Sequence, residues 1–273
     1  MNEKLSQEAL QKILEQSILD IIGGENGLRK ETNMLIEKHK QKVHFIPIKY
    51  RVLGGFLQSL NIKFGNFIEI LIPKLIMLIE TDIEVIKEYS GTKNVKLSLE
   101  QKCEREIDDY INHPPKKINN EIITKLLDNI FTLQNNEKGK LKAETFDIDL
   151  LIKKNKKYYY IETKYNDDHD TGKFKDINRK FLKTYAGLVH ELGIKNRDNF
   201  SPIIYYFNEN IRYKDVYFKE GINVFRGRQL FEELQFSVKF SDIEGILLKI
   251  SENLENKFDE FKDKIFKMVK NHE

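Results

Sequence analysis

The first half of the chain has the hydrophobic spacing of amphipathic helices. Apolar residues recur there every three or four positions, which places them on one face of a helix. The spacing predicts helices over residues 3–22, about 30–40, 64–80, 101–112 and 118–133. Gly23-Gly24 is expected to end the first helix, and Pro73 to kink the third or mark its restart.

Beyond residue 135 the period changes from 3.6 to 2, the spacing of β-strands. Strands are predicted over about 146–153 and 157–164, and the uncharged segment 202–207 is expected to be a buried strand in mid-sheet. A helix over about 176–193, ended by Gly193, lies between them. The other expected elements are a strand or loop within 81–101, short strands at 216–219 and 222–225, and helices over about 227–235 and 241–270.

This order of elements predicts an α/β fold with a mixed central sheet flanked by helices, a helical N-terminal part and a long C-terminal helix. The chain contains no internal repeat and no low-complexity linker, so a single domain over residues 1–273 is expected. Its parts would be a mainly helical segment, an α/β core and the terminal helix, over residues 1–135, 136–240 and 241–273. The apolar stripe of the terminal helix is interpreted as core, with a dimer interface as the second interpretation.

Composition narrows the class of protein. Hydrophobic residues make up 40% of the chain and charged residues 33%, which is typical of a soluble globular protein. The single cysteine, Cys103, excludes an intramolecular disulfide and a cysteine metal cluster, and this fits a cytoplasmic protein. No signal peptide is predicted, and the longest apolar run, about 67–79, is too short to span a membrane. The net charge is only +3, so any nucleic-acid-binding surface would have to be local.

The two strands over 146–164 carry the most informative chemistry. The polar link between them contains Asn155, which tolerates the left-handed backbone of tight hairpins. If Asn155 and Lys156 form a two-residue turn, the same register places Asp149 opposite Glu162. Directly opposed side chains lie about 4.5–5.5 Å apart at Cβ. Two carboxylates would then repel each other unless a cation lies between them.

Such a pair of carboxylates suits a hard divalent cation such as Mg²⁺. Asp149 and Glu162 would supply two ligands, the main-chain carbonyl of Thr163 a third, and Lys164 would lie beside the metal. There it could position or deprotonate an attacking water. The alternative is a solvated face of an edge hairpin with a cross-strand ion pair. Asp147 is expected to share the face of Asp149, as a structural acid or as a further ligand.

The arrangement resembles the PD-(D/E)xK nuclease superfamily, in which an acidic residue at a strand bend precedes Glu-x-Lys in the next strand. Asp149, Glu162 and Lys164 match that signature, although Ile148 stands where the name has proline. The blocks FIPIKYRVLGGFLQSLNIKFGNFIE, FDIDLLI, IETKYNDDHDTGKFKDINRKFLKTYAGL, PIIYYFN and NVFRGRQLFEEL resemble successive parts of type II restriction endonucleases over roughly 45–235. Among these enzymes, the chain most resembles the group that cuts short interrupted palindromes of the GGNCC kind.

This resemblance implies a restriction-endonuclease-like core and Mg²⁺-dependent hydrolysis of double-stranded DNA at a specific short sequence, leaving 5′-phosphates. A homodimer is expected on a palindromic site, together with a DNA methyltransferase that protects the host. The resemblance also implies that Glu69, in the block GNFIE, completes the metal site; its alternative is an exposed position at the helix edge. The alternatives for function are a repair or junction-resolving nuclease of the same fold, and a non-catalytic DNA-binding module.

Two groups of basic residues are candidates for DNA contacts. A solvated helix face is the ordinary interpretation of the first group, but beside a metal site such a face would bind phosphates. It consists of Lys173, Lys175, Arg179, Lys180 and Lys183. Arg226 and Arg228 form the second group, because arginine can bind phosphate or guanine with two hydrogen bonds. The loop 165–176 around His169 is expected to be polar and mobile rather than a zinc or calcium site.

Overall fold

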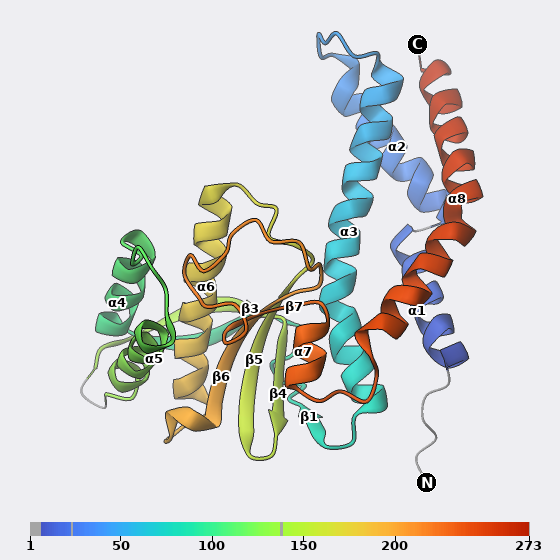
Figure 1. Cartoon of the computed structure of the whole chain (residues 1–273). Coiled ribbons are helices and arrows are strands. Elements are labelled where there is room, and N and C mark those ends of the chain that lie inside the picture. Colours follow the sequence, from blue (N-terminus) through green and yellow to red (C-terminus); the bar gives the residue numbers. More distant parts are fainter. Residues whose placement is uncertain (1–6, 23, 137–138, 273) are drawn as a thin grey trace. The chain divides into compact units, whose positions relative to one another are not determined.

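A computed structural model describes residues 7–22, 24–136 and 139–272 of the chain (Figure 1). The chain divides into two compact units. One unit consists of Met1–Phe67 with Val238–Glu273, and the other of Ile68–Ser237. The α/β class and the mixed sheet flanked by helices are confirmed, whereas the single domain over 1–273 stays a prediction. No helix in the described part of the chain is long and apolar enough to cross a membrane.

The unit Ile68–Ser237 is built on a five-stranded sheet. Its strands, in the order in which they lie in the sheet, are β1 (Ile83–Val85), β4 (Leu150–Lys154), β5 (Lys157–Lys164), β6 (Phe200–Tyr206) and β7 (Val224–Arg226). β1 pairs antiparallel with β4 and β4 with β5, while β5, β6 and β7 run parallel, so the sheet is mixed. The strand predicted over 202–207 is β6, and it lies inside the sheet as expected. Of the two short candidates, only 222–225 overlaps a strand, and 216–219 forms none.

The predicted strand over 146–153 is two strands separated by a bend at Asp149. β3 (Leu141–Ile148) pairs antiparallel with β2 (Thr92–Glu100) in a separate two-stranded sheet, and the chain turns at the bend into β4. The expectation that Asp147 shares the face of Asp149 is therefore wrong. Asp147 is exposed, and its Oδ1 accepts a hydrogen bond from the Asn94 N–H at 2.9 Å.

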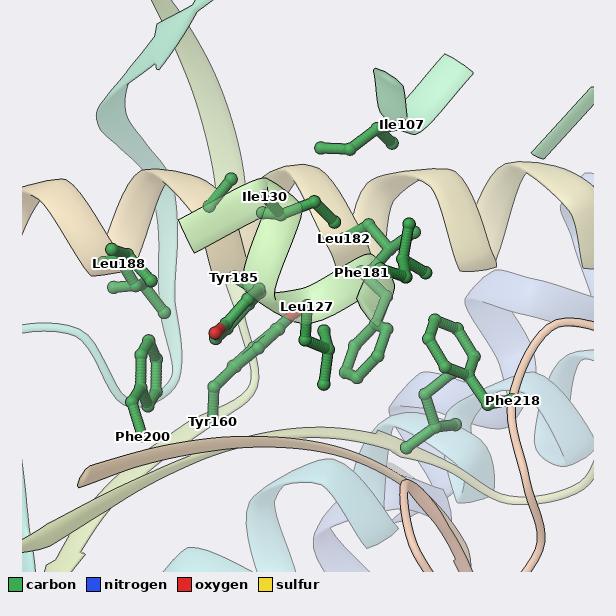
Figure 2. Packing of buried hydrophobic residues seen from close by; sticks show 14 of the residues in the cluster. Ile107, Leu127, Ile130, Tyr160, Phe181, Leu182, Tyr185, Leu188, Phe200 and Phe218 are labelled. Atoms are coloured by element: carbon green, nitrogen blue, oxygen red, sulfur yellow. The ribbon is translucent and has the colours of Figure 1, made fainter. Parts of the chain in front are cut away.

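Helix α6 (Thr171–Glu191) packs on one face of the sheet, against side chains from β5 and β6. It begins five residues before the predicted start, because Asp170 caps it by accepting from the Lys173 N–H. Figure 2 shows the resulting core. The rings of Tyr160 and Phe181 stack there with their centroids 5.5 Å apart. Helices α4 (Gln101–Asn112) and α5 (Asn120–Gln134) and the short η1 (Arg197–Asn199) and α7 (Arg228–Glu233) complete this unit.

The unit formed by the two ends of the chain is helical. It contains α1 (Gln7–Ile22), α2 (Gly24–Lys40), the first part of α3 (Ile48–Ile79) and α8 (Phe240–Lys270). α3 is longer than predicted and continues through Pro73, so the predicted restart does not occur. The apolar stripe of α8 is mostly buried, and Phe261 packs edge-on against Phe56 at 6.2 Å.

Candidate active site

The hairpin β4–β5 has the register that the sequence predicted. Lys154 pairs with Lys157 across a two-residue turn in which Asn155 and Lys156 have φ of 49° and 69°. These positive φ values are those of a type I′ turn, whose twist matches that of the strands. Counted away from the turn, the last pair is Leu150 with Ile161. Asp149 and Glu162 are the next residue on each side, just beyond the paired part of the hairpin.

Lys164, the last residue of β5, lies at the centre of the site. Its Nζ is 3.0 Å from Oε1 of Glu162, 3.1 Å from Oδ2 of Asp149 and 3.2 Å from Oε1 of Glu69. It also donates to the main-chain carbonyl oxygen of Thr163 at 2.7 Å. Four oxygens, from α3, the bend and β5, therefore converge on one cation.

Asp149 is held at the bend by its neighbours. It is nearly buried, and its Oδ2 accepts a hydrogen bond from the Thr163 N–H at 2.9 Å. Burial, and then the nearby Glu162, raises the pKa of Asp149 to about 7. The enclosed position of Asp149 therefore disfavours its charged form, and Lys164 offsets part of this cost.

Glu162 is the most enclosed of the three carboxylates. Its Oε2 accepts from the Tyr160 hydroxyl at 2.7 Å, and its Oε1 lies 3.1 Å from Nζ of Lys180 on α6. Burial opposes its ionisation, but Lys164 and Lys180 outweigh burial and hold the pKa of Glu162 below its usual value. Burial would lower the pKa of Lys164, yet the three carboxylates raise it above its usual value.

Tyr160 is a member of this site that the sequence-based prediction missed. The signal was present, because Tyr160 precedes Glu162 by two residues in a strand and so shares its face. Burial raises the pKa of Tyr160 well above its usual value, so its hydroxyl remains a hydrogen-bond donor to the carboxylate. Tyr160 thus fixes the orientation of Glu162.

The predicted basic patch on α6 is largely neutralised by acids. Lys180 binds Glu162, and Lys183 binds Glu104 at 2.7 Å. Arg179 forms ion pairs with Asp108 and Asp176 at 3.0 and 2.8 Å. Within the part of the chain that the structure describes, Lys173 and Lys175 form no ion pair, and Lys173 is exposed. The structure therefore leaves fewer cations free on this helix than the sequence suggested.

Arg226 is buried rather than on the surface. Its guanidinium binds both carboxylate oxygens of Glu220, Oδ2 of Asp167 at 2.9 Å and the carbonyl oxygen of Asn210 at 2.8 Å, and it lies over the Tyr206 ring. This network ties β7 to the loops that follow β5 and β6. Arg226 is thus not available to DNA in this arrangement.

Arg228 differs from Arg226, since its side chain is 72% exposed and lies 3.9 Å from Glu209. It stays a candidate for DNA contact.

The donors around Lys164 fit a hard divalent cation. Asp149, Glu162 and Glu69 contribute carboxylate oxygens and Thr163 a carbonyl oxygen, the ligand types that Mg²⁺ prefers. No group of three or more His, Cys, Asp or Glu among the described residues is arranged as a ready metal site. The ammonium of Lys164 lies where these oxygens converge, so a metal would have to share them with Lys164 or displace it.

Comparison with known proteins gives the family. The family model described as "Type II restriction endonuclease, HinfI" matches residues 6–251. The chain is 37% identical to the type II restriction enzyme HinfI of Haemophilus influenzae, over 98% of this chain and 100% of that protein. No solved structure matches. The match covers both units and all the residues around Lys164, and the chain therefore belongs to the HinfI family of type II restriction endonucleases.

Proposed function

We propose that this site-specific deoxyribonuclease hydrolyses phosphodiester bonds of double-stranded DNA with Mg²⁺ at the site around Lys164. The observation that carries the proposal is the convergence of four oxygens on a single cation position. Asp149, Glu162 and the Thr163 carbonyl would hold the metal, and Glu69 would complete the site. These positions also support membership of the PD-(D/E)xK superfamily.

Each side chain of the site has a distinct part in the reaction. Bound Mg²⁺ would neutralise charge on the phosphate and lower the pKa of a bound water. Lys164 orients the attacking water and stabilises the charge that develops on the phosphate oxygens. Tyr160 and Lys180 hold Glu162 in a fixed orientation through both of its oxygens. Because these two contacts are already formed, Glu162 itself needs little reorganisation when substrate binds.

The chemical balance is that of a simple hydrolysis. The water gives up a proton as its oxygen forms a bond to phosphorus, the bond from phosphorus to the 3′ oxygen breaks, and the leaving oxygen takes up a proton, so protons balance. The products are a 5′-phosphate and a 3′-hydroxyl. Water is the nucleophile in this scheme, so no covalent enzyme intermediate forms.

A homodimer is the assembly we propose on DNA. A two-fold protein matches a palindromic sequence and presents one site to each strand. A DNA methyltransferase of the same specificity is the expected partner in the cell, and the cytoplasm the expected location. Membership of a restriction family gives no support to the junction-resolving or non-catalytic alternatives.

Digestion of plasmid DNA tests the proposed function. With Mg²⁺ the purified protein should yield discrete fragments that carry 5′-phosphates, and chelation of the metal should stop the reaction. Sequencing the fragment ends gives the recognition sequence and tests the expected GGNCC kind. A ladder of random fragments, cleavage in the presence of a chelator, or no cleavage with either Mg²⁺ or Mn²⁺ would contradict the proposal.

A further inference from the structure

The loop between α2 and α3 exposes apolar side chains to solvent. Val43 is fully exposed, Phe45 is 92% exposed and Ile46 is 37% exposed. The His44 ring stacks on the Phe45 ring at 4.8 Å. Single exposed apolar residues are common on proteins, but several side by side at a projecting loop indicate a contact surface.

The same segment is the most one-sided run of charge in the chain. Residues 38–51, here named the hairpin tip, contain five cationic residues, and no Asp or Glu occurs from 38 to 68. The five are Lys38, Lys40, Lys42, Lys49 and Arg51. Among the described residues Lys38 and Lys42 have no ion pair, and Lys40 has only an exposed contact with Glu37 at 3.8 Å. The whole chain carries just +3, so this charge is strongly local.

The end of α8 adds to this charge. Phe266 packs edge-on against Tyr50 in the first turn of α3, with ring centroids 5.5 Å apart, and Lys49 lies over both rings. After Asp263 the described part of α8 carries lysines and no acid. The lysines are Lys264, Lys267 and Lys270. The hairpin tip and the end of α8 therefore form one basic surface.

The hairpin tip is held in shape by its own hydrogen bonds. Nη1 of Arg51 donates to the carbonyl oxygens of His39 and Lys42 at 3.2 and 3.3 Å. The Ile46 N–H donates to Nδ1 of His44 at 2.9 Å, and α3 begins directly after Pro47. A loop fixed in this way loses little conformational entropy when it binds a partner.

We propose that the hairpin tip is a second contact surface for duplex DNA, with its lysines on phosphates and Phe45 with Val43 in a groove. The choice of DNA as ligand rests on the proposed function. Lysines that neutralise phosphates release counterions, and apolar wedges inserted between or against bases are a known mode of groove binding. A second copy of the chain fits less well, because a two-fold contact through this surface would oppose like charges.

A tryptophan placed at the tip tests the apolar part of the contact. The chain contains no tryptophan, so Phe45→Trp creates a single reporter. Leu248→Trp is the matched control, since Leu248 is 66% exposed on α8 of the same unit. With metal chelated to prevent cleavage, duplex DNA should quench the fluorescence of Phe45→Trp by about half or more and leave Leu248→Trp nearly unchanged.

Three outcomes of that titration would overturn the proposal. The first is an unchanged Phe45→Trp signal while a labelled duplex shows that DNA is bound. The second is a signal that changes with protein concentration in the absence of DNA, which would identify a second copy as the occupant. The third is a blue shift with vesicles of phosphatidylserine and no response to DNA, which would identify a membrane surface.

Neutralising the lysines tests the electrostatic part. The variant Lys38→Gln/Lys40→Gln/Lys42→Gln should bind duplex DNA about tenfold more weakly or worse, and the slope of log Kd against log salt should fall by about 0.9 for each lost phosphate contact. The control Lys12→Gln/Lys249→Gln/Lys257→Gln removes three exposed lysines of the same unit and should leave both quantities unchanged. Equal binding by the two triple variants would overturn the proposal.

Plasmid cleavage by the wild type separates the two hypotheses. If the wild type cuts DNA and the tip variants bind as well as the controls, only the hairpin-tip proposal fails. If the wild type cuts no DNA, the proposed function fails. The fluorescence and salt-dependence measurements of DNA binding then test the hairpin-tip proposal separately.

Discussion

At the scale of single residues, the site sets three carboxylates against two ammonium groups, with Asp149 and Glu162 buried and Glu69 34% exposed. Asp149, Glu162 and Glu69 all contact Lys164, whereas Lys180 contacts Glu162. Buried charges are tolerated only when they are paired. In the absence of metal, Lys164 is the one cation among the described residues that pairs with all three carboxylates.

Removal of Lys164 should therefore destabilise the metal-free protein. We expect Lys164→Ala to lower the free energy of unfolding by about 3 kcal/mol in the presence of a chelator, because buried Asp149 loses its cation and buried Glu162 keeps only Lys180. Mg²⁺ should restore part of this loss by binding the folded state. Thermal unfolding with and without Mg²⁺ measures both effects.

Lys173→Ala is the control for that experiment, since Lys173 is exposed and without an ion pair among the described residues. It should change stability little and should show no additional dependence on Mg²⁺ relative to the wild type. A Lys164→Ala protein as stable as the wild type in the chelator would contradict the role of Lys164 as the counter-ion of the site.

Cys103 gives a second prediction at this scale. It is buried in α4, and burial raises the pKa of its thiol to about 12. Only the thiolate is nucleophilic, so at about pH 8 the folded protein should react with iodoacetamide far more slowly than the same protein unfolded in guanidinium. Labelling measured by mass spectrometry checks this. Equal rates for the two states would show that the thiol is accessible.

At the scale of elements, the hairpin β4–β5 was the part that sequence predicted best. The apolar pattern predicted the strands and Asn155 predicted the turn, so the register from Lys154–Lys157 to Leu150–Ile161 followed from local information. The strand limits of β5 and the turn at Asn155 and Lys156 agree with the structure. Local signals were sufficient here because a two-residue turn fixes the pairing of both strands.

The turn itself can be tested by substitution. Lys156 has a φ of 69°, a left-handed backbone conformation that is less favourable for a residue with a side chain than for glycine. Lys156→Gly should raise the free energy of unfolding by about 0.5–1 kcal/mol without changing DNA cleavage. Lys157→Gly, one residue later in β5, is the matched control and should lower the free energy of unfolding, because glycine weakens a strand. A loss of stability in Lys156→Gly would contradict the type I′ turn.

The bend at Asp149 could not be predicted from the same pattern. The alternation of apolar residues continues from β3 into β4, but β3 pairs with β2, about fifty residues earlier in the chain. Only this long-range pairing separates Asp147 from Asp149. Arg226 is a similar case, because its burial depends on Glu220 and Asp167, and the segment FRGR gives no sign of either partner.

At the scale of the whole molecule, the chain combines an α/β unit that carries the site with a helical unit that carries the hairpin tip. One chain offers one cluster around Lys164, and cutting both strands of a palindrome calls for two. We therefore expect two chains on each duplex. Light scattering on a mixture of protein and a short duplex containing the recognition sequence, with metal chelated, should give the mass of two chains and one duplex. A complex with a single chain that still cuts both strands in one binding event would contradict the homodimer.

The central claim is that the cluster of Asp149, Glu162 and Lys164 is the hydrolytic site, and single-turnover cleavage of a duplex with the recognition sequence tests it most directly. Lys164→Ala should still bind the duplex but should cut it at least about 100-fold more slowly than the wild type in Mg²⁺. Lys125→Ala, which removes an exposed lysine of α5, should stay within a few-fold of the wild-type rate. A folded Lys164→Ala protein that binds the duplex and cuts it at the wild-type rate would contradict the account.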